Sequence, residues 1–217
     1  MNDDNAPPES TENGEKSATG IELPAIEFQS PGRFAVANPD TPTSDAPLVE
    51  AAPFELGSHA KLERFDHPDQ ARAHSLALLQ QAQRSLCIYS HDLEPWLYHR
   101  SSVQQACTRF LLASPRNQLR ILVRDTGRAV KEGHRLLNLS RRLPSNLHIR
   151  KLNPDYPSEE LAFLLADDCG LLLLPQPGQV SGYALYQDAA RVRQRRTQFD
   201  QAWDTSITDT DLRSFLL

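Results

Sequence analysis

The chain has 217 residues, 16 of them proline, and an apolar fraction of 39%, which suits one complete domain joined to a segment that does not fold. Residues 1–57 carry eleven acidic and two basic side chains, whereas residues 58–217 carry 17 acidic and 21 basic ones, a mildly basic domain behind an acidic leader. With no signal peptide, no apolar run long enough for a bilayer and three widely spaced cysteines, the sequence excludes secreted, membrane-spanning and disulfide-bonded classes and leads us to expect a cytoplasmic protein.

The predicted elements begin after a segment without periodicity. Residues 1–57 hold half of the prolines, which predicts a disordered acidic tail followed by a folded domain over residues 58–217. Strands are expected at 61–65, 85–90, 119–125 and 147–152, and a hairpin at 161–166 and 171–174. Helices are expected at 68–82, 103–113, 127–143 and 189–203. Because helices separate most of these strands, the order predicts an α/β fold with a mostly parallel mixed sheet flanked by helices.

Short sequence anchors accompany these elements in a fixed order. They are Phe65-Asp66, Ser85-Leu-Cys-Ile-Tyr-Ser90, Leu119-Arg-Ile-Leu-Val-Arg-Asp125, Tyr183-Ala-Leu-Tyr-Gln-Asp188 and Phe199-Asp-Gln-Ala-Trp203. In this order the chain resembles one half of the phospholipase D-like fold over about residues 60–206. It also looks like an uncharacterised bacterial version of that fold. The resemblance implies a homodimer, because the two half-sites of the family meet across an interface between halves or subunits.

The resemblance also implies where an active site would lie. Active members carry His-x-Lys-x-x-x-x-Asp on the late hairpin strand: the His attacks a phosphodiester, the Lys holds the phosphate oxygens and the Asp orients the His. In this chain the strand that ends at Asp167 has Glu160 at the His position and Ala162 at the Lys position. A carboxylate would repel the substrate phosphate, so we expect this site to be inactive.

A literal match to the same motif occurs earlier, at His59-Ala-Lys61-Leu-Glu-Arg-Phe-Asp66. It precedes the first helix, and the four residues between Lys61 and Asp66 lack the apolar character of the family's buried strand. A motif outside its structural context is weak evidence. A phosphodiesterase that uses His59, Lys61 and Asp66 at a dimer interface therefore remains an alternative.

Polar side chains gather after two neighbouring predicted strands, where open α/β sheets place their ligands. The candidate ligand-binding residues are His91, Asp92, Glu94, Arg124, Asp125, Arg128, His134 and Arg135. Arginines around a helix N-terminus suit an anion. The alternative interpretation is structural: Asp125 caps the following helix, His134 packs in the core and the arginines pair with nearby carboxylates.

Three other patterns are weaker evidence for a function. His91 and His99 with nearby carboxylates have no metal-ligand spacing, so no metal is predicted. The arginines of the last predicted helix spread around its circumference, which favours a solvated face and makes nucleic acid an unlikely partner. Trp96 and Tyr98 suggest an exposed aromatic edge or core packing.

The leading hypothesis is a non-catalytic phospholipase D-like binding or regulatory module that recognises an anionic ligand or a protein partner. The second is the phosphodiesterase described above. The third is an accessory interaction domain for an acyltransferase-type partner. No Gly-rich turn that would hold a pyrophosphate is present, so no cofactor is predicted.

Overall fold

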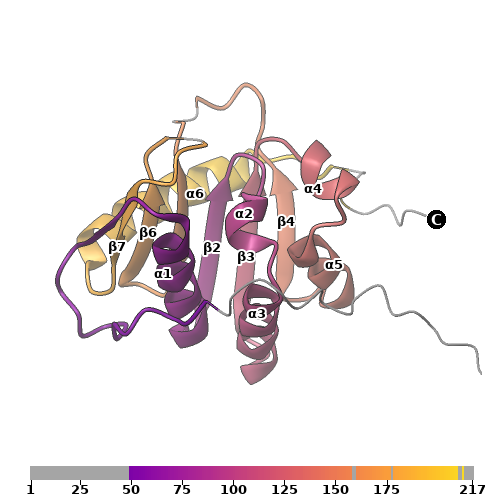
Figure 1. Cartoon of the computed structure of the whole chain (residues 1–217). Helices are drawn as coiled ribbons and strands as arrows, with labels where there is room; N and C mark the ends of the chain where they lie inside the picture. The colour runs from indigo at the N-terminus through magenta and orange to yellow at the C-terminus, as the bar shows by residue number, and fades with distance from the viewer. Residues whose placement is uncertain (1–48, 158–159, 177, 210–211, 213–217) are drawn as a thin grey trace, which may run out of the picture. The chain divides into compact units, whose positions relative to one another are not determined.

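The computed structural model describes residues 49–157, 160–176, 178–209 and 212, so the predicted tail lies outside the described residues up to residue 48. The described part forms seven strands and six helices (Figure 1). The strands are β1 (Glu63–Phe65), β2 (Ser85–Ser90), β3 (Gln118–Val123), β4 (Leu147–Lys151), β5 (Ala162–Ala166), β6 (Gly170–Leu174) and β7 (Gly182–Leu185). The helices are α1 (Pro68–Gln81), α2 (Pro95–Tyr98), α3 (Ser101–Ala113), α4 (Gly127–Lys131), α5 (Arg135–Arg142) and α6 (Ala189–Asp204).

The seven strands form one sheet in the order β1-β7-β6-β5-β2-β3-β4. The mixed α/β sheet flanked by helices that the sequence predicts is confirmed. Parallel pairing is less extensive than expected, since it joins only β2 to β3 and β3 to β4. The other four pairings are antiparallel, because β5 enters the sheet alongside β2 in the opposite direction and β6, β7 and β1 extend it from there.

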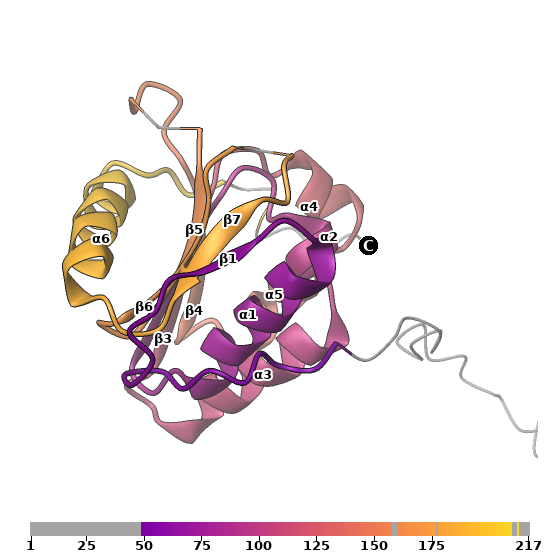
Figure 2. The same ribbon diagram turned by 60° about the vertical axis from the view of Figure 1, so that its left-hand side comes forward.

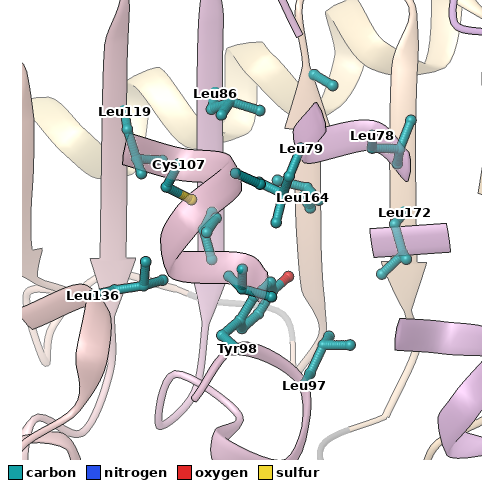
Figure 3. Close-up of a cluster of buried hydrophobic side chains, with 14 of the residues drawn as sticks. Leu78, Leu79, Leu86, Leu97, Tyr98, Cys107, Leu119, Leu136, Leu164 and Leu172 are labelled. Atoms are coloured by element: carbon teal, nitrogen blue, oxygen red, sulfur yellow. The ribbon is translucent and has the colours of Figure 1, made fainter. Parts of the chain in front are cut away.

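Helices cover both faces of this sheet. Figure 2 shows α1, α3 and α5 on one face and α6 on the other. All five residues of β5 are buried, and their side chains alternate between the two faces. Leu164 belongs to the cluster under α1 and α3 (Figure 3), whereas Phe163 and Leu165 belong to the cluster under α6. A strand buried on both faces has an uninterrupted apolar sequence, as β5 and β6 do.

The helix predicted over 127–143 is two helices. Gly133 has φ +60°, a left-handed conformation that ends the first helix and that glycine adopts without steric cost. His134 then caps α5, and its Nδ1 accepts a hydrogen bond from the backbone N–H of Leu136 at 3.2 Å. The single glycine in an otherwise helical pattern therefore marks a real break.

Residues 49–57, which composition assigned to the tail, pack on the domain; we call them the N-terminal strap. The Phe54 ring stacks on His74 with 5.5 Å between ring centres. The backbone N–H of Ala52 donates to the carbonyl of Ala73 at 3.0 Å, and that of Gly57 to the carbonyl of Tyr186 at 2.8 Å. The folded part of the chain thus extends upstream of residue 58.

Candidate functional site

The carboxyl ends of β2 and β3 and the start of β5 meet at one edge of the sheet, because β2 is parallel to β3 and antiparallel to β5 (Figure 1). A small hollow lies at this edge, lined by Tyr89, Ser90, His91, Arg124, Leu152, Glu160 and Leu161. The fold therefore brings two separate sequence predictions together. Arg124 and His91 come from the predicted strand-end cluster, and Glu160 is the residue that the sequence resemblance aligns with the nucleophile.

A second hollow adjoins the first and shares Arg124 and Leu152 with it. Its volume is about 250 Å³, and Asn153, Pro154 and Tyr156 complete its lining. Unlike the first hollow, it has no carboxylate among the described residues of its wall. Arg124 is half-buried, and its guanidinium makes no ion pair or hydrogen bond with any side chain in the described part of the chain. A guanidinium that lines a hollow and has no side-chain partner can bind an anion.

The loop that follows β2 is held by a buried carboxyl group. Glu94 is only 7% exposed, and its two oxygens accept hydrogen bonds from the Ser90 hydroxyl at 2.7 Å and the His91 backbone N–H at 3.3 Å. Burial raises the pKa of Glu94 to about 7, and the nearby Asp92 carboxylate adds to this rise. Leu93 and Glu94 have φ values of 67° and 25°, so the loop also stores backbone strain.

Several predicted site residues have structural partners instead. Arg128 pairs with Asp92 at 3.1 Å and with Glu132 at 3.0 Å. The Asp125 carboxylate accepts a hydrogen bond from the Gly127 backbone N–H at 2.9 Å, at the start of α4. These residues therefore follow the structural interpretation, and Arg128 lines neither hollow around Arg124.

His134 and Arg135 also lie apart from Arg124. His134 is fully buried, and this burial lowers the pKa of its imidazole to about 3. Its ring lies edge-on to His99, with 5.0 Å between ring centres. Arg135 donates to Gln104 at 3.2 Å. Arg124 therefore lines the two hollows at the carboxyl ends of β2 and β3 without Arg128 or His134 among their described lining residues.

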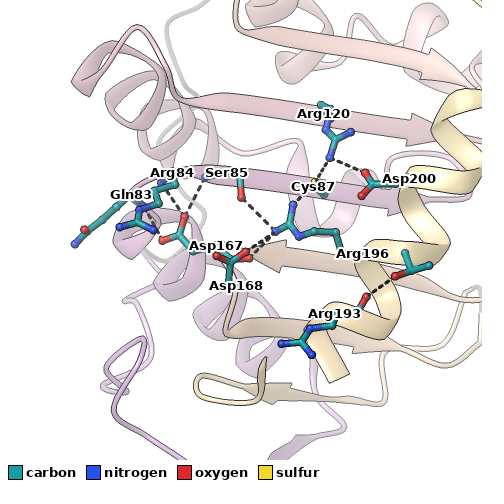
Figure 4. A network of polar contacts seen from close by, with 11 residues as sticks. Gln83, Arg84, Ser85, Cys87, Arg120, Asp167, Asp168, Arg193, Arg196 and Asp200 are labelled. Atoms are coloured by element: carbon teal, nitrogen blue, oxygen red, sulfur yellow. Dashed lines mark hydrogen bonds and ion pairs between the residues drawn. The ribbon is translucent and has the colours of Figure 1, made fainter. Parts of the chain in front are cut away.

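The three positions of the late motif lie at opposite ends of β5. Glu160 is exposed before the strand, and Ala162 is its first, buried residue. Asp167 follows the strand at its other end, where its carboxylate accepts hydrogen bonds from the backbone N–H groups of Gln83, Arg84 and Ser85 (Figure 4). Asp167 is thus occupied in anchoring the start of β2, away from Glu160.

The early motif is not assembled either. His59 Nε2 lies 2.8 Å from Glu63 Oε1, and its ring packs against Phe54 with 4.4 Å between ring centres. Lys61 and Asp66 are exposed. Within the described ranges, no hydrogen bond or ion pair joins His59 to Lys61 or Asp66.

Sequence reasoning missed Asn153 and Tyr156, which lie in the loop after β4. The available signal was their position after a third predicted parallel strand, at the same edge as His91 and Arg124. The aromatic-edge interpretation of Trp96 and Tyr98 is wrong: Tyr98 is 2% exposed, and Trp96 packs against the same core cluster.

The described residues form neither a metal site nor a membrane-spanning helix. No group of three or more His, Cys, Asp and Glu side chains is arranged to hold a metal ion in this part of the chain. Among the helices that the structure describes, none has the length and apolar character needed to cross a membrane.

Comparisons with known proteins bear on the fold. A family model described as a domain of unknown function (DUF7931) matches residues 67–215. No curated protein sequence matches the chain. Among solved structures, TrmBL2, an archaeal chromatin protein described as showing a novel mode of DNA binding, is similar with a TM-score of 0.52 and 12% identity. The match covers 73% of this chain and 55% of TrmBL2, so this chain spans about half of that protein.

Two shorter proteins are covered almost completely. NucT from Helicobacter pylori has a TM-score of 0.50 and 10% identity, over 69% of this chain and 99% of its own. Nuc from Salmonella typhimurium, a phospholipase D family member, has a TM-score of 0.47 and 12% identity, over 67% of this chain and 94% of its own. Identities this low bear on fold alone, and the TM-scores of TrmBL2 and NucT indicate that this chain shares their fold.

Proposed function

We propose that this chain, which belongs to the family of the domain of unknown function DUF7931, is a phospholipase D-like module that binds an anionic ligand and does not hydrolyse phosphodiesters. The observation that carries the proposal is the composition of the sheet edge at the start of β5, where Arg124 and Glu160 line one hollow. The sequence resemblance assigns Glu160 and Ala162 to the positions of the His and Lys of active members, which supports the absence of hydrolysis.

The case against phosphodiester hydrolysis is chemical. The family's reaction needs an imidazole nitrogen as nucleophile and an ammonium group to hold the phosphate oxygens. A carboxylate at residue 160 repels the phosphate, and the methyl group of Ala162 offers no compensating charge. Asp167 cannot restore the site, because its carboxylate is engaged with backbone N–H groups at the far end of β5.

The case for anion binding rests on the second hollow. Arg124 supplies a guanidinium, Tyr156 a phenol and Asn153 an amide, and all three groups can donate hydrogen bonds to an oxyanion. Asn153 Oδ1 accepts a hydrogen bond from the Asp155 backbone N–H at 3.0 Å, which fixes that side chain and leaves its NH₂ group for a ligand. Among the described residues that line this hollow none is a carboxylate, which favours an anion over a cation.

The first test is hydrolysis of bis(4-nitrophenyl) phosphate by the purified protein and by its His59→Gln variant. We expect neither to release nitrophenol above the rate in buffer alone. Activity in the natural protein that the variant loses would contradict the proposal and identify the early motif as an active site.

The second test is a titration with inorganic phosphate, followed by the amide chemical shifts of the protein. We expect shifts that saturate around residues 153–156 and that weaken about tenfold or more in Arg124→Gln, since a charge-assisted hydrogen bond is worth roughly 1.5–3 kcal/mol. Arg116→Gln is the matched control, because Arg116 is an exposed arginine that precedes the same strand at its other end. Equal binding by all three proteins would contradict the assignment of Arg124.

Partners belong to the same proposal. A homodimer is expected from the resemblance, and sedimentation should then give twice the protomer mass of 24.4 kDa. The net charge of residues 58–217, 21 basic minus 17 acidic or +4, is small for a protein that binds nucleic acid, so a DNA duplex at physiological salt should not bind. A protein ligand, including one of the acyltransferase type, would instead have to present a carboxylate or phosphate to Arg124.

A further inference from the structure

A separate hollow of about 850 Å³ lies beside β1 and β7. It shares no lining residue with the two hollows around Arg124. Its wall is built from β1 and the start of β7, the first turn of α1, the first turn of α6 and two residues of the segment between β6 and β7. A volume of this size falls in the range of small-molecule sites, roughly 300–1,000 Å³.

Two arginines on different elements give this wall a positive charge. Arg64 of β1 is exposed and forms no ion pair within the described ranges. Arg191 of α6 is 51% exposed, and its Nε lies 3.6 Å from the Asp188 carboxylate. The terminal nitrogens of Arg191 therefore remain available, and Asp66 is the only carboxylate among the described residues of the lining.

An aromatic ring lies between the two arginines. Tyr183 is the cross-strand partner of Arg64 in the β1–β7 pairing, and the Arg191 guanidinium carbon is 6.0 Å from the centre of its ring. Tyr183 is half-buried, so part of the ring faces the hollow. Leu62 and Pro175 extend the apolar side of the wall.

Polar side chains with both donors and acceptors complete the wall at the start of α1. Gln70 contributes an amide, and its Oε1 is 3.4 Å from the Asp66 backbone N–H. Asp66 contributes a carboxylate that can accept hydrogen bonds from an amino group. These donors and acceptors match the hydrogen-bonding edge of a nucleobase. A simple acid would need only the two arginines.

We propose that this hollow binds a mononucleotide, with the base against Tyr183 and the phosphate between Arg64 and Arg191. A bare anion would leave the apolar wall unused, and a neutral apolar molecule would leave two guanidiniums without counter-charge. Base stacking on an aromatic ring contributes roughly 1–3 kcal/mol, and arginine binds phosphate through paired hydrogen bonds. This site does not depend on the proposed function at Arg124.

The test is isothermal titration of the full chain with adenosine 5′-monophosphate, adenosine and inorganic phosphate. We expect the monophosphate to bind at least about tenfold more tightly than either fragment, because only it uses both halves of the wall. Arg64→Gln, Arg191→Gln and Tyr183→Ala should each weaken it by about tenfold or more. Arg193→Gln, an exposed arginine of the same helix outside the lining, and Arg124→Gln should bind as the natural protein does.

Five results would overturn the proposal. One is no heat of binding with millimolar monophosphate. Another is unchanged affinity in both Arg64→Gln and Arg191→Gln, with circular dichroism showing that the variants are folded. Adenosine binding as tightly as the monophosphate would remove the role of the arginines. Inorganic phosphate binding as tightly as the monophosphate in Arg124→Gln, where the other proposed phosphate site is removed, would remove the role of Tyr183. A loss of binding in Arg124→Gln alone would move the site to the other hollow.

Discussion

Asp167 is a residue whose sequence position and structural role differ. The sequence resemblance assigns it to the motif position that orients the nucleophile in active members, yet its carboxylate accepts three backbone hydrogen bonds of 2.9, 2.7 and 3.0 Å at the start of β2. We expect Asp167→Ala to lower the free energy of unfolding in urea by about 2 kcal/mol, since hydrogen bonds to a charged group are lost. Asp168→Ala is the control: its side chain is 82% exposed, and the change should stay within about 0.5 kcal/mol. Equal effects would contradict the anchoring role.

Glu94 makes stability depend on pH. Burial raises the pKa of its carboxyl from 4.5 to about 7, so the folded protein keeps a proton that the unfolded chain releases. The cost of burying Glu94 therefore grows as pH rises from about 4.5 to about 7 and is constant above that. Glu94→Gln removes the titration. The unfolding free energy of the variant minus that of the natural protein should increase by on the order of 3 kcal/mol across this window.

The measurement for Glu94 is urea unfolding of both proteins at several pH values between 4.5 and 8. Taking the difference cancels the titration of groups that both proteins share. Glu132→Gln is the matched control, because Glu132 is an exposed carboxylate paired with Arg128, and its difference should vary by less than about 1 kcal/mol. A flat difference for Glu94→Gln would show that its carboxyl is not protonated at neutral pH in the folded state.

At the scale of elements, secondary structure could be predicted where the sequence has a strong hydrophobic periodicity. The buried strands β2, β3 and β5 and the helices α1, α3 and α6 lie within a few residues of their predicted bounds, because each has a long apolar pattern. β7 was not predicted as a strand: it has four residues and is stabilised by pairing with β6 and β1, which no local pattern indicates. Arg124 directly follows β3 and was predicted from that strand, whereas Tyr156 lies five residues beyond the end of β4 and was missed, although the position of β4 was a signal for it.

Two glycines, Gly182 and Gly133, should each resist substitution by alanine, but for different structural reasons. A Cβ at Gly182 would lie 2.3 Å from the Leu173 carbonyl oxygen and 2.8 Å from the Phe65 ring, so Gly182→Ala must push β7 away from β6 or β1. A Cβ at Gly133 would meet nothing within 4 Å, and only its positive φ opposes a side chain. We expect Gly133→Ala to cost about 1–2 kcal/mol and Gly182→Ala clearly more, measured by thermal unfolding. A larger loss in Gly133→Ala would contradict this account.

At the scale of the whole molecule, amino-acid composition identified the acidic N-terminal segment but not the residue at which the folded domain begins. Proline and acidic residues continue through Pro53 and Glu55, so the boundary was set at residue 57. Phe54 and Leu56 nevertheless pack against the core cluster, and Gln81 of α1 binds the strap on both sides of residue 55. Sheet topology was equally beyond local reasoning, because β5 lies next to β2 across more than 70 residues of chain.

The strap makes a prediction about truncation. Removing residues 1–48 should leave the midpoint of thermal unfolding within about 2 °C of the full chain, if the leader contributes no packing to the domain. Removing residues 1–57 also strips Phe54 from the rings of His74 and Tyr186 and Leu56 from its site beside Gly170. With roughly 1.5 kcal/mol for each partly buried apolar side chain, the midpoint should fall by about 6–12 °C. Phe54→Ala in the full chain should reproduce about half of this fall. If both truncations behaved alike, the strap would not be part of the stable domain and the boundary would return to residue 57.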